Sequence, residues 1–114
     1  MPRETLGEFE QLVLLAILHL ADEGERDVYG VPIVDEIERR TRRSASRVAV
    51  YVALRRLEKR GLVNTWMGEP VAERGGKARR CVKVTGTGLQ VLQDTRHAMD
   101  RMWAGLDPNL EKNG

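Results

Sequence analysis

At 114 residues the chain has room for one domain with a single modest core, and its net charge of +2 is close to neutral. The one cysteine, Cys81, excludes an internal disulfide framework, and the longest apolar run, Leu12–Ala21, is too short to cross a membrane. No secretory signal pattern follows Met1, so we expect a cytoplasmic protein that does not contact membranes.

The first predicted helix begins at a capping-box spacing, with Thr5 as the cap and Glu8 as its partner. From Leu12 to Ala21 every residue except His19 is apolar. A helix that is apolar all round has to be covered all round, and a chain of this size has core for only one side. A second copy of the chain is therefore predicted to cover the other side.

Two shorter helices are predicted next. The first of them carries Pro32 in its opening turn, where the missing N–H costs nothing, and runs out near Thr41. After a polar turn at Arg42–Ala45, Ser46 is predicted to cap a helix that Gly61 ends. The helix after Ser46 has its inward face at Val50, Leu54 and Leu57. Two short helices joined by a tight turn, the second with an arginine near its start, indicate a helix-turn-helix.

A β-hairpin and a last helix complete the predicted elements. Leu62–Met67 and Arg80–Val84 have strand-like patterns, and Gly68–Arg79 between them predicts a flexible wing with a basic tip. Thr85 is predicted to cap a helix over Gly86–Gly105, whose apolar residues follow the spacing of a heptad seam. The seam consists of Leu89, Leu92, Met99, Trp103 and Leu106, with Arg96 in the gap. We expect it to contact the first helix of a partner copy.

The near-neutral net charge hides a strong segregation. Residues 39–60 carry nine Lys or Arg and one acid, residues 74–83 carry five and no acid, and the remainder of the chain is strongly acidic. Two concentrated basic segments suggest a surface for a polyanion, although they are also compatible with ordinary solvated faces. Combined with the helix-turn-helix, they predict a protein that binds double-stranded DNA.

Nine short segments, in order along nearly the whole chain, are similar to one family: Leu6–Glu10, Leu14–Leu18, Tyr29-Gly30, Ala49–Tyr51, Leu54–Lys59, Gly61–Val63, Arg74–Lys77, Val84-Thr85 and Gly88. They resemble the PadR-like winged helix-turn-helix transcriptional regulators, in the short form with one C-terminal helix. The resemblance implies a homodimer that binds an inverted-repeat operator, usually as a repressor. In several such regulators a small apolar or aromatic effector binds near the dimer interface and relieves repression.

The chain departs from the family pattern in two places. Arg47-Val48 stands where a Leu-Gly pair is common, so the operator sequence does not carry over. Cys81-Val82 replaces an aromatic pair in the second wing strand. On this basis we expect a winged helix-turn-helix DNA-binding domain over residues 1–84, whose N-terminal helix also contacts the partner. A dimerisation helix follows over 85–106, with a tail over 107–114.

The N-terminal part of a recognition helix points into the major groove, where base edges distinguish all four pairs. The residues predicted to read bases are Ser46, Arg47, Val48, Tyr51 and Val52. By spacing alone Tyr51 is equally compatible with a half-buried core position, and the family resemblance favours DNA. Cations further along the helix and in the turn fix the register by holding phosphates; these are Arg42, Arg43, Arg55 and Lys59.

Two further sets of residues are candidate sites. The wing is predicted to reach the minor groove or adjacent phosphates through Arg74, Gly75, Gly76, Lys77, Arg79 and Arg80. The dimer contact, and an effector pocket if there is one, is predicted at Phe9, Leu89, Leu92, Met99, Trp103 and Leu106. Plain interface packing is the simpler explanation of Trp103, and a pocket for a flat apolar compound is the more specific hypothesis.

Catalysis is not expected. His19, His97 and Cys81 lie far apart with no metal-ligand spacing, and no nucleophile elbow or phosphate loop is present, so neither a metal nor another cofactor is predicted. The more serious alternative is a winged helix used only for protein contacts. That alternative predicts an acidic partner and no affinity for duplex DNA.

Overall fold

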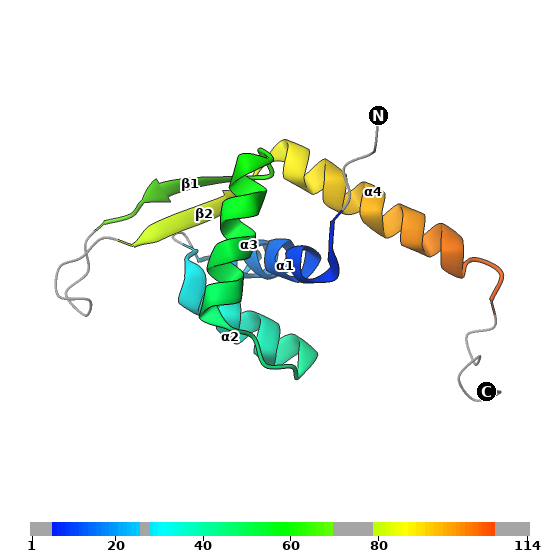
Figure 1. Ribbon diagram of the computed structural model, residues 1–114, viewed down its shortest axis with the longest axis horizontal. Helices are drawn as coiled ribbons and strands as arrows, with labels where there is room; N and C mark the ends of the chain where they lie inside the picture. Colours follow the sequence, from blue (N-terminus) through cyan, green and yellow to red (C-terminus); the bar gives the residue numbers. More distant parts are fainter. Residues whose placement is uncertain (1–5, 26–27, 70–78, 107–114) are drawn as a thin grey trace.

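The computed structural model describes residues 6–25, 28–69 and 79–106. Within these ranges it has four helices and a two-stranded antiparallel sheet, which confirms the mainly α fold with a small β-hairpin (Figure 1). The elements are α1 (Glu8–Asp22), α2 (Gly30–Thr41), α3 (Arg47–Lys59), β1 (Val63–Met67), β2 (Arg80–Val84) and α4 (Gly86–Trp103). No helix in the described ranges is both long and apolar enough to span a bilayer.

The caps predicted for α3 and α4 are present. The side-chain oxygen of Ser46 accepts a hydrogen bond from the Ala49 N–H at 3.2 Å, and that of Thr85 accepts one from the Gly88 N–H at 2.9 Å. Each satisfies one of the N–H groups that an α-helix leaves unpaired in its first turn. The starts of α3 and α4 are therefore fixed where the sequence places them.

The start of α1 differs from the prediction. The cap is Gly7, whose N–H donates to the Glu10 carboxylate at 3.0 Å, so the capping box expected from Thr5 and Glu8 is wrong. Leu6 explains the shift because its side chain is buried in the core, which holds the chain extended up to Gly7. Thr5 lies outside the described residues.

Helix α1 is the centre of the core, and its own protomer covers most of it. It packs against α2, α3, β2 and the start of α4. Its buried residues are Val13, Leu14, Ala16, Ile17 and Leu20. Leu12 and Leu18 are half-buried, and Leu15 is 42% exposed. The apolar surface that α1 leaves exposed is therefore a strip around Leu15, narrower than the whole side that the apolar run suggests.

The hairpin is joined to the rest of the fold along β2. In the sheet, Thr65 of β1 lies opposite Val82 of β2. The Val82 N–H also donates to the Val28 carbonyl at 2.8 Å, so the segment that leads into α2 lies along β2. The predicted wing-tip residues Arg74, Gly75, Gly76 and Lys77 lie outside the described part of the chain.

Helix α4 leaves the core partway along its length. Gly88 and Leu92 are buried, whereas every residue from Arg96 to Leu106 is exposed. Figure 1 shows α4 running away from the other helices, in the opposite direction to the hairpin. Leu92, expected on the dimer seam, belongs to the protomer's own core at 7% exposure because the first turns of α4 pack on α1. Its assignment to the partner contact is corrected accordingly.

Candidate nucleic-acid interface

The outward face of α3 presents apolar and cationic side chains side by side. Its inward face is anchored in the core by Val50, Ala53 and Leu57. Val48 is 71% exposed, although a valine is among the side chains most often buried. Exposed with it are Ser46, Arg47, Tyr51, Val52, Arg55 and Lys59. Apolar groups suit a thymine methyl and guanidiniums suit guanine, so this surface has the chemistry needed to read base edges.

The sequence is compatible with either a DNA-facing or a half-buried position for Tyr51, and the structure shows a side chain that is partly exposed and partly packed. Its side chain is 46% exposed, yet the ring lies against the backbone of Gly30 in the first turn of α2. A Cβ atom at Gly30 would come within 2.6 Å of that ring. Gly30 therefore allows a close helix–helix approach that sets the direction of the Tyr51 hydroxyl.

The turn between α2 and α3 is fixed by its own hydrogen bonds. Arg42 adopts the left-handed conformation, with φ of 59°, and its N–H donates to the Glu38 carbonyl at 2.9 Å. The Glu38 carboxylate then accepts a hydrogen bond from the Ala45 N–H at 2.8 Å. One residue thus fixes both sides of the turn, and with it the angle at which α3 projects.

Part of the basic segment is neutralised locally by acids on α1 and α2 or just after α1. Glu36, only 4% exposed, accepts hydrogen bonds from Arg40 and from Arg39, the latter at 2.8 Å. Arg40 also lies 3.3 Å from Glu23. The hydrogen bond from Arg40 lowers the pKa of the Glu36 carboxyl despite the opposing effect of burial, and Arg39 adds to the lowering. Arg39 and Arg40 are therefore engaged in ion pairs within the fold.

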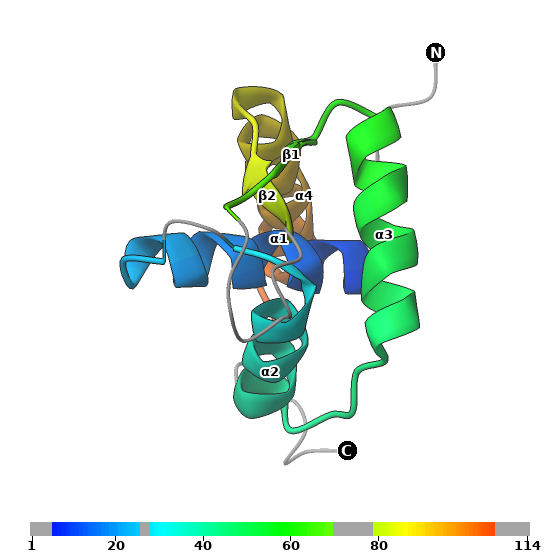
Figure 2. The same ribbon diagram turned by 90° about the vertical axis from the view of Figure 1, so that its left-hand side faces the viewer.

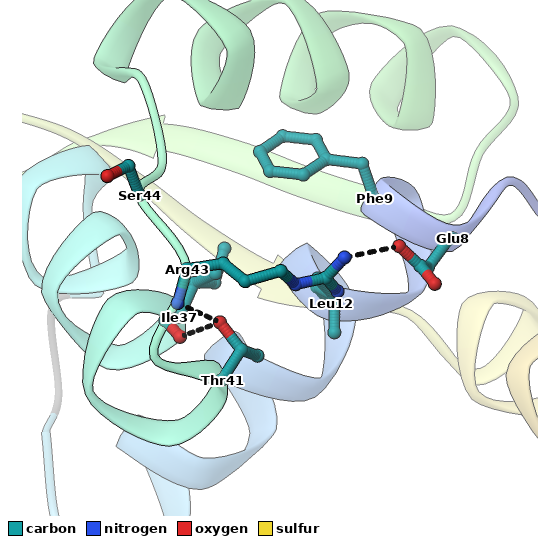
Figure 3. Close-up of a pocket in the computed structure, with 7 residues that line it drawn as sticks. All are labelled: Glu8, Phe9, Leu12, Ile37, Thr41, Arg43 and Ser44. Atoms are coloured by element: carbon teal, nitrogen blue, oxygen red, sulfur yellow. Dashed lines mark hydrogen bonds and ion pairs between the residues drawn. The ribbon is translucent and has the colours of Figure 1, made fainter.

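Two more arginines form ion pairs with the first turn of α1. Arg43, predicted to hold a phosphate, donates to Glu8 at 3.0 Å beside a small pocket of about 100 Å³ (Figure 3). Arg60 lies 3.5 Å from Glu10. Phe9 lines the same pocket as Arg43 and packs, half-buried, against the core. A phosphate on Arg43 would have to compete with Glu8.

The other cations of residues 39–60 form no ion pair with any residue in the described ranges; they are Arg42, Arg47, Arg55, Arg56 and Lys59. The structure thus divides a segment that looks uniformly basic in sequence. Arg47, Arg55 and Lys59 lie on the exposed face of α3 that also carries Val48 and Val52, and none of the three is paired with a carboxylate in the described ranges.

The two described arginines of the wing have different surroundings. The Arg79 guanidinium lies over the Tyr29 ring, 4.4 Å from its centroid, which ties the loop end of the hairpin to the segment before α2. Arg80 is exposed and donates to the Thr65 hydroxyl at 2.7 Å. Of the two, Arg80 is the one placed to meet a ligand beside α3.

The sequence profile of the transcriptional regulator PadR-like family matches residues 17–94, which is most of the chain. The chain belongs to this family. A transcriptional regulator from Clostridium thermocellum is 24% identical, with a TM-score of 0.63 over 82% of this chain and 84% of that one. A PadR family regulator from Eggerthella lenta is 24% identical, with a TM-score of 0.64 over 86% and 81%. A comparison with curated proteins finds no significant match.

A third solved structure, a PadR-like transcription factor from Bacteroides fragilis, is 19% identical with a TM-score of 0.66 over 82% of each chain. At these identities the solved structures establish the winged helix fold of this PadR-like chain, and the contacts above come from its own residues. Within the described ranges, no cluster of three or more His, Cys, Asp or Glu is arranged to hold a metal ion.

The exposed end of α4 is the remaining candidate surface of this family member. Met99, Trp103 and Leu106, all predicted for the dimer contact, are more than half exposed, and Leu89 is 42% exposed. Met102 is the most exposed of all at 76%, although it lies off the heptad seam and the sequence pattern misses it. The exposed apolar surface of this C-terminal segment is therefore concentrated in the last turns of α4 and just after its end.

Proposed function

We propose that this PadR-like chain is a sequence-specific repressor that binds an inverted-repeat DNA operator as a homodimer through α3. The observation that carries the proposal is the outward face of α3, where exposed Val48 and Val52 lie among cations with no acidic partner in the described ranges. Exposure of an apolar side chain such as Val48 or Val52 to water does not stabilise the protein, so water alone gives no reason for valine at these positions. The major groove suits both kinds of side chain.

The proposed division of labour follows the exposure of each residue. Ser46, Arg47, Val48, Tyr51 and Val52 read bases, while Arg42, Arg55 and Lys59 hold phosphates. Arg43 contributes to phosphate binding only when its ion pair with Glu8 opens. Residues 1–84 form the DNA-binding domain in this proposal, and residues 85–106 form the dimerisation helix.

Salt dependence tests the DNA contact. Affinity for a duplex is expected to fall steeply as salt rises, because each phosphate bound by a cation releases counterions. Arg55→Gln should lower the slope of log affinity against log salt by about 0.9 per protomer. Fluorescence anisotropy of a labelled palindromic duplex over a range of NaCl concentrations measures this slope.

Arg56→Gln is the matched control, because this substitution removes the same charge from the neighbouring position of α3. Arg56 itself has no role in the proposed contact. Its slope should stay closer to that of the wild type than the slope of Arg55→Gln. An affinity for every duplex that barely changes with salt would contradict DNA binding. It would favour a winged helix that binds only proteins.

The homodimer is proposed to form through the exposed end of α4 and the strip around Leu15 on α1. Four large apolar side chains in the last turns of α4 and just after its end are more than half exposed; they are Met99, Met102, Trp103 and Leu106. Contiguous apolar surface of this kind marks an interaction site in a water-soluble protein. Two-fold symmetry would then place two α3 helices for the two halves of an inverted repeat.

The proposed effector is a flat apolar or aromatic compound that binds beside Trp103 in the dimer contact and relieves repression. Titration of the protein's tryptophan fluorescence with a panel of aromatic compounds should give saturable quenching by at least one of them. The quenching should disappear in Trp103→Ala, which leaves Trp66 as the remaining fluorophore. Quenching that persists unchanged in this variant would contradict the site.

A further inference from the structure

A groove of about 310 Å³ lies between α3 and the hairpin. One wall is formed by α3 and the other by the two strands. Figure 2 shows the ribbon of α3 to the right of β1 and β2. The lining residues are Tyr51, Leu54, Arg55 and Glu58 from α3, Thr65 from β1, and Arg80 and Val82 from β2. Apolar side chains form part of the lining, and two guanidiniums and one carboxylate supply its charge.

A directed chain of hydrogen bonds crosses this groove. Arg80 donates through Nη1 to the Thr65 hydroxyl at 2.7 Å, and the same hydroxyl donates to the Glu58 carboxylate. Because a hydroxyl has one proton to donate and lone pairs to accept with, both bonds form together without conflict. Thr65 thus links the strand to the last turn of α3 and gives the Arg80 guanidinium a defined position.

The charge in the groove suits one phosphodiester. Arg55 and Arg80 bring two positive charges against one negative charge from Glu58, and neither arginine lies within ion-pair distance of Glu58. The Thr65 bond uses one of the five N–H groups of the Arg80 guanidinium. A guanidinium that is held in place and has further donors is a good phosphate ligand.

We propose that this groove binds one backbone phosphate of the DNA, between the recognition helix and the wing, and that Thr65 and Glu58 are positioning residues that hold Arg80 for it. The inference rests on the proposed function, because the groove lies beside the base-reading face of α3. A DNA strand that passes from α3 to the hairpin crosses the groove. Glu58 then strengthens DNA binding even though it is an acid on a DNA-facing surface.

A double-mutant cycle on a duplex that the wild type binds tests the proposal. Thr65→Val changes no charge and keeps a β-branched side chain, so any effect must come from the lost hydroxyl. It should weaken binding by about three- to tenfold, while Thr65→Ser should bind like the wild type. Arg80→Gln should weaken binding further and lower the salt slope by about 0.9 per protomer. In the Arg80→Gln background, Thr65→Val should cause no additional loss.

The sign of the Glu58 effect provides a second test that does not depend on the stability of the Thr65 variants. Loss of a negative charge beside DNA should by itself tighten binding. The positioning role predicts instead that Glu58→Met binds more weakly than the wild type.

Tighter binding by Glu58→Met, or equal losses from Thr65→Val in the wild-type and Arg80→Gln backgrounds, would overturn the groove proposal. If the wild type still binds DNA with a steep salt dependence, the proposed function stands. Absence of salt-dependent duplex binding by the wild type would overturn both.

Discussion

Trp103→Asp is expected to convert the proposed dimer into a monomer and to weaken binding to the proposed operator by at least about a hundredfold. The side chain is 60% exposed in the protomer, so its replacement removes little from the protomer's own core. In the dimer it would place a buried carboxylate opposite apolar side chains, which strongly disfavours association. Each half-site would then be bound separately, without the high effective concentration that the second α3 gains from its tether to the first.

Arg101→Gln is the matched control for this substitution. It changes the net charge by the same amount on the same helix, at a position about half a turn away from Met99 and Trp103. Sedimentation equilibrium and anisotropy with a palindromic duplex should show a wild-type dimer and wild-type affinity for this control. A Trp103→Asp protein that remains dimeric would show that the end of α4 is not the dimer contact.

Gly88→Ala is expected to destabilise the protein by about 3 kcal/mol. In an open helical position the same change stabilises by about 1 kcal/mol, because alanine is the better helix former. At Gly88 a Cβ atom would lie 2.1 Å from the Leu62 carbonyl oxygen and 3.1 Å from Cγ1 of Val84. The Leu62 oxygen also accepts a hydrogen bond from the Thr85 N–H at 3.0 Å, so the backbone cannot move aside without losing it.

Gly86→Ala, two residues earlier in the same helix, is the control, since a Cβ atom there would contact nothing within 4 Å. Urea unfolding followed by circular dichroism should show Gly86→Ala as stable as the wild type or more so. The close approach at Gly88 sets the direction in which α4 leaves the core, and therefore the spacing of the two α3 helices in the proposed dimer. Wild-type stability for Gly88→Ala would show that this junction is not rigid.

The elements and two of their caps could be predicted from the sequence because their signals are local. Ser46 and Thr85 each lie just before a periodic apolar pattern, and their hydroxyls accept the predicted hydrogen bonds. The start of α1 could not be predicted in the same way. The burial of Leu6 decided it, and burial depends on the assembled core.

The division of the basic segment had only a partial signal in the sequence. Glu36 precedes Arg39 and Arg40 by three and four residues, a spacing that places all three on one helix face. The pair between Arg43 and Glu8 joins residues 35 positions apart, and that between Arg60 and Glu10 joins residues 50 apart. No local pattern predicts such pairs, so charge counting overestimates the surface that is free for DNA.

The assignment of Leu92 to the dimer seam shows the same limitation. A heptad pattern identifies a stripe on a helix but not which partner covers each part of it. The first turns of α4 pack on their own protomer and bury Leu92, whereas the last turns extend beyond the core and leave Met102 exposed. The groove between α3 and the hairpin was likewise absent from the sequence pattern, because Glu58, Thr65 and Arg80 come from three different elements.

Selection of bound duplexes from a pool of random DNA tests the central claim most directly. The full-length protein is predicted to enrich a palindromic sequence whose two half-sites lie about one helical turn, or roughly 34 Å, apart. Enrichment should change at defined positions in Arg47 and Val48 variants, since those side chains are proposed to read bases. Failure to enrich any sequence, or enrichment of a single unpaired site, would contradict a dimeric, sequence-specific regulator.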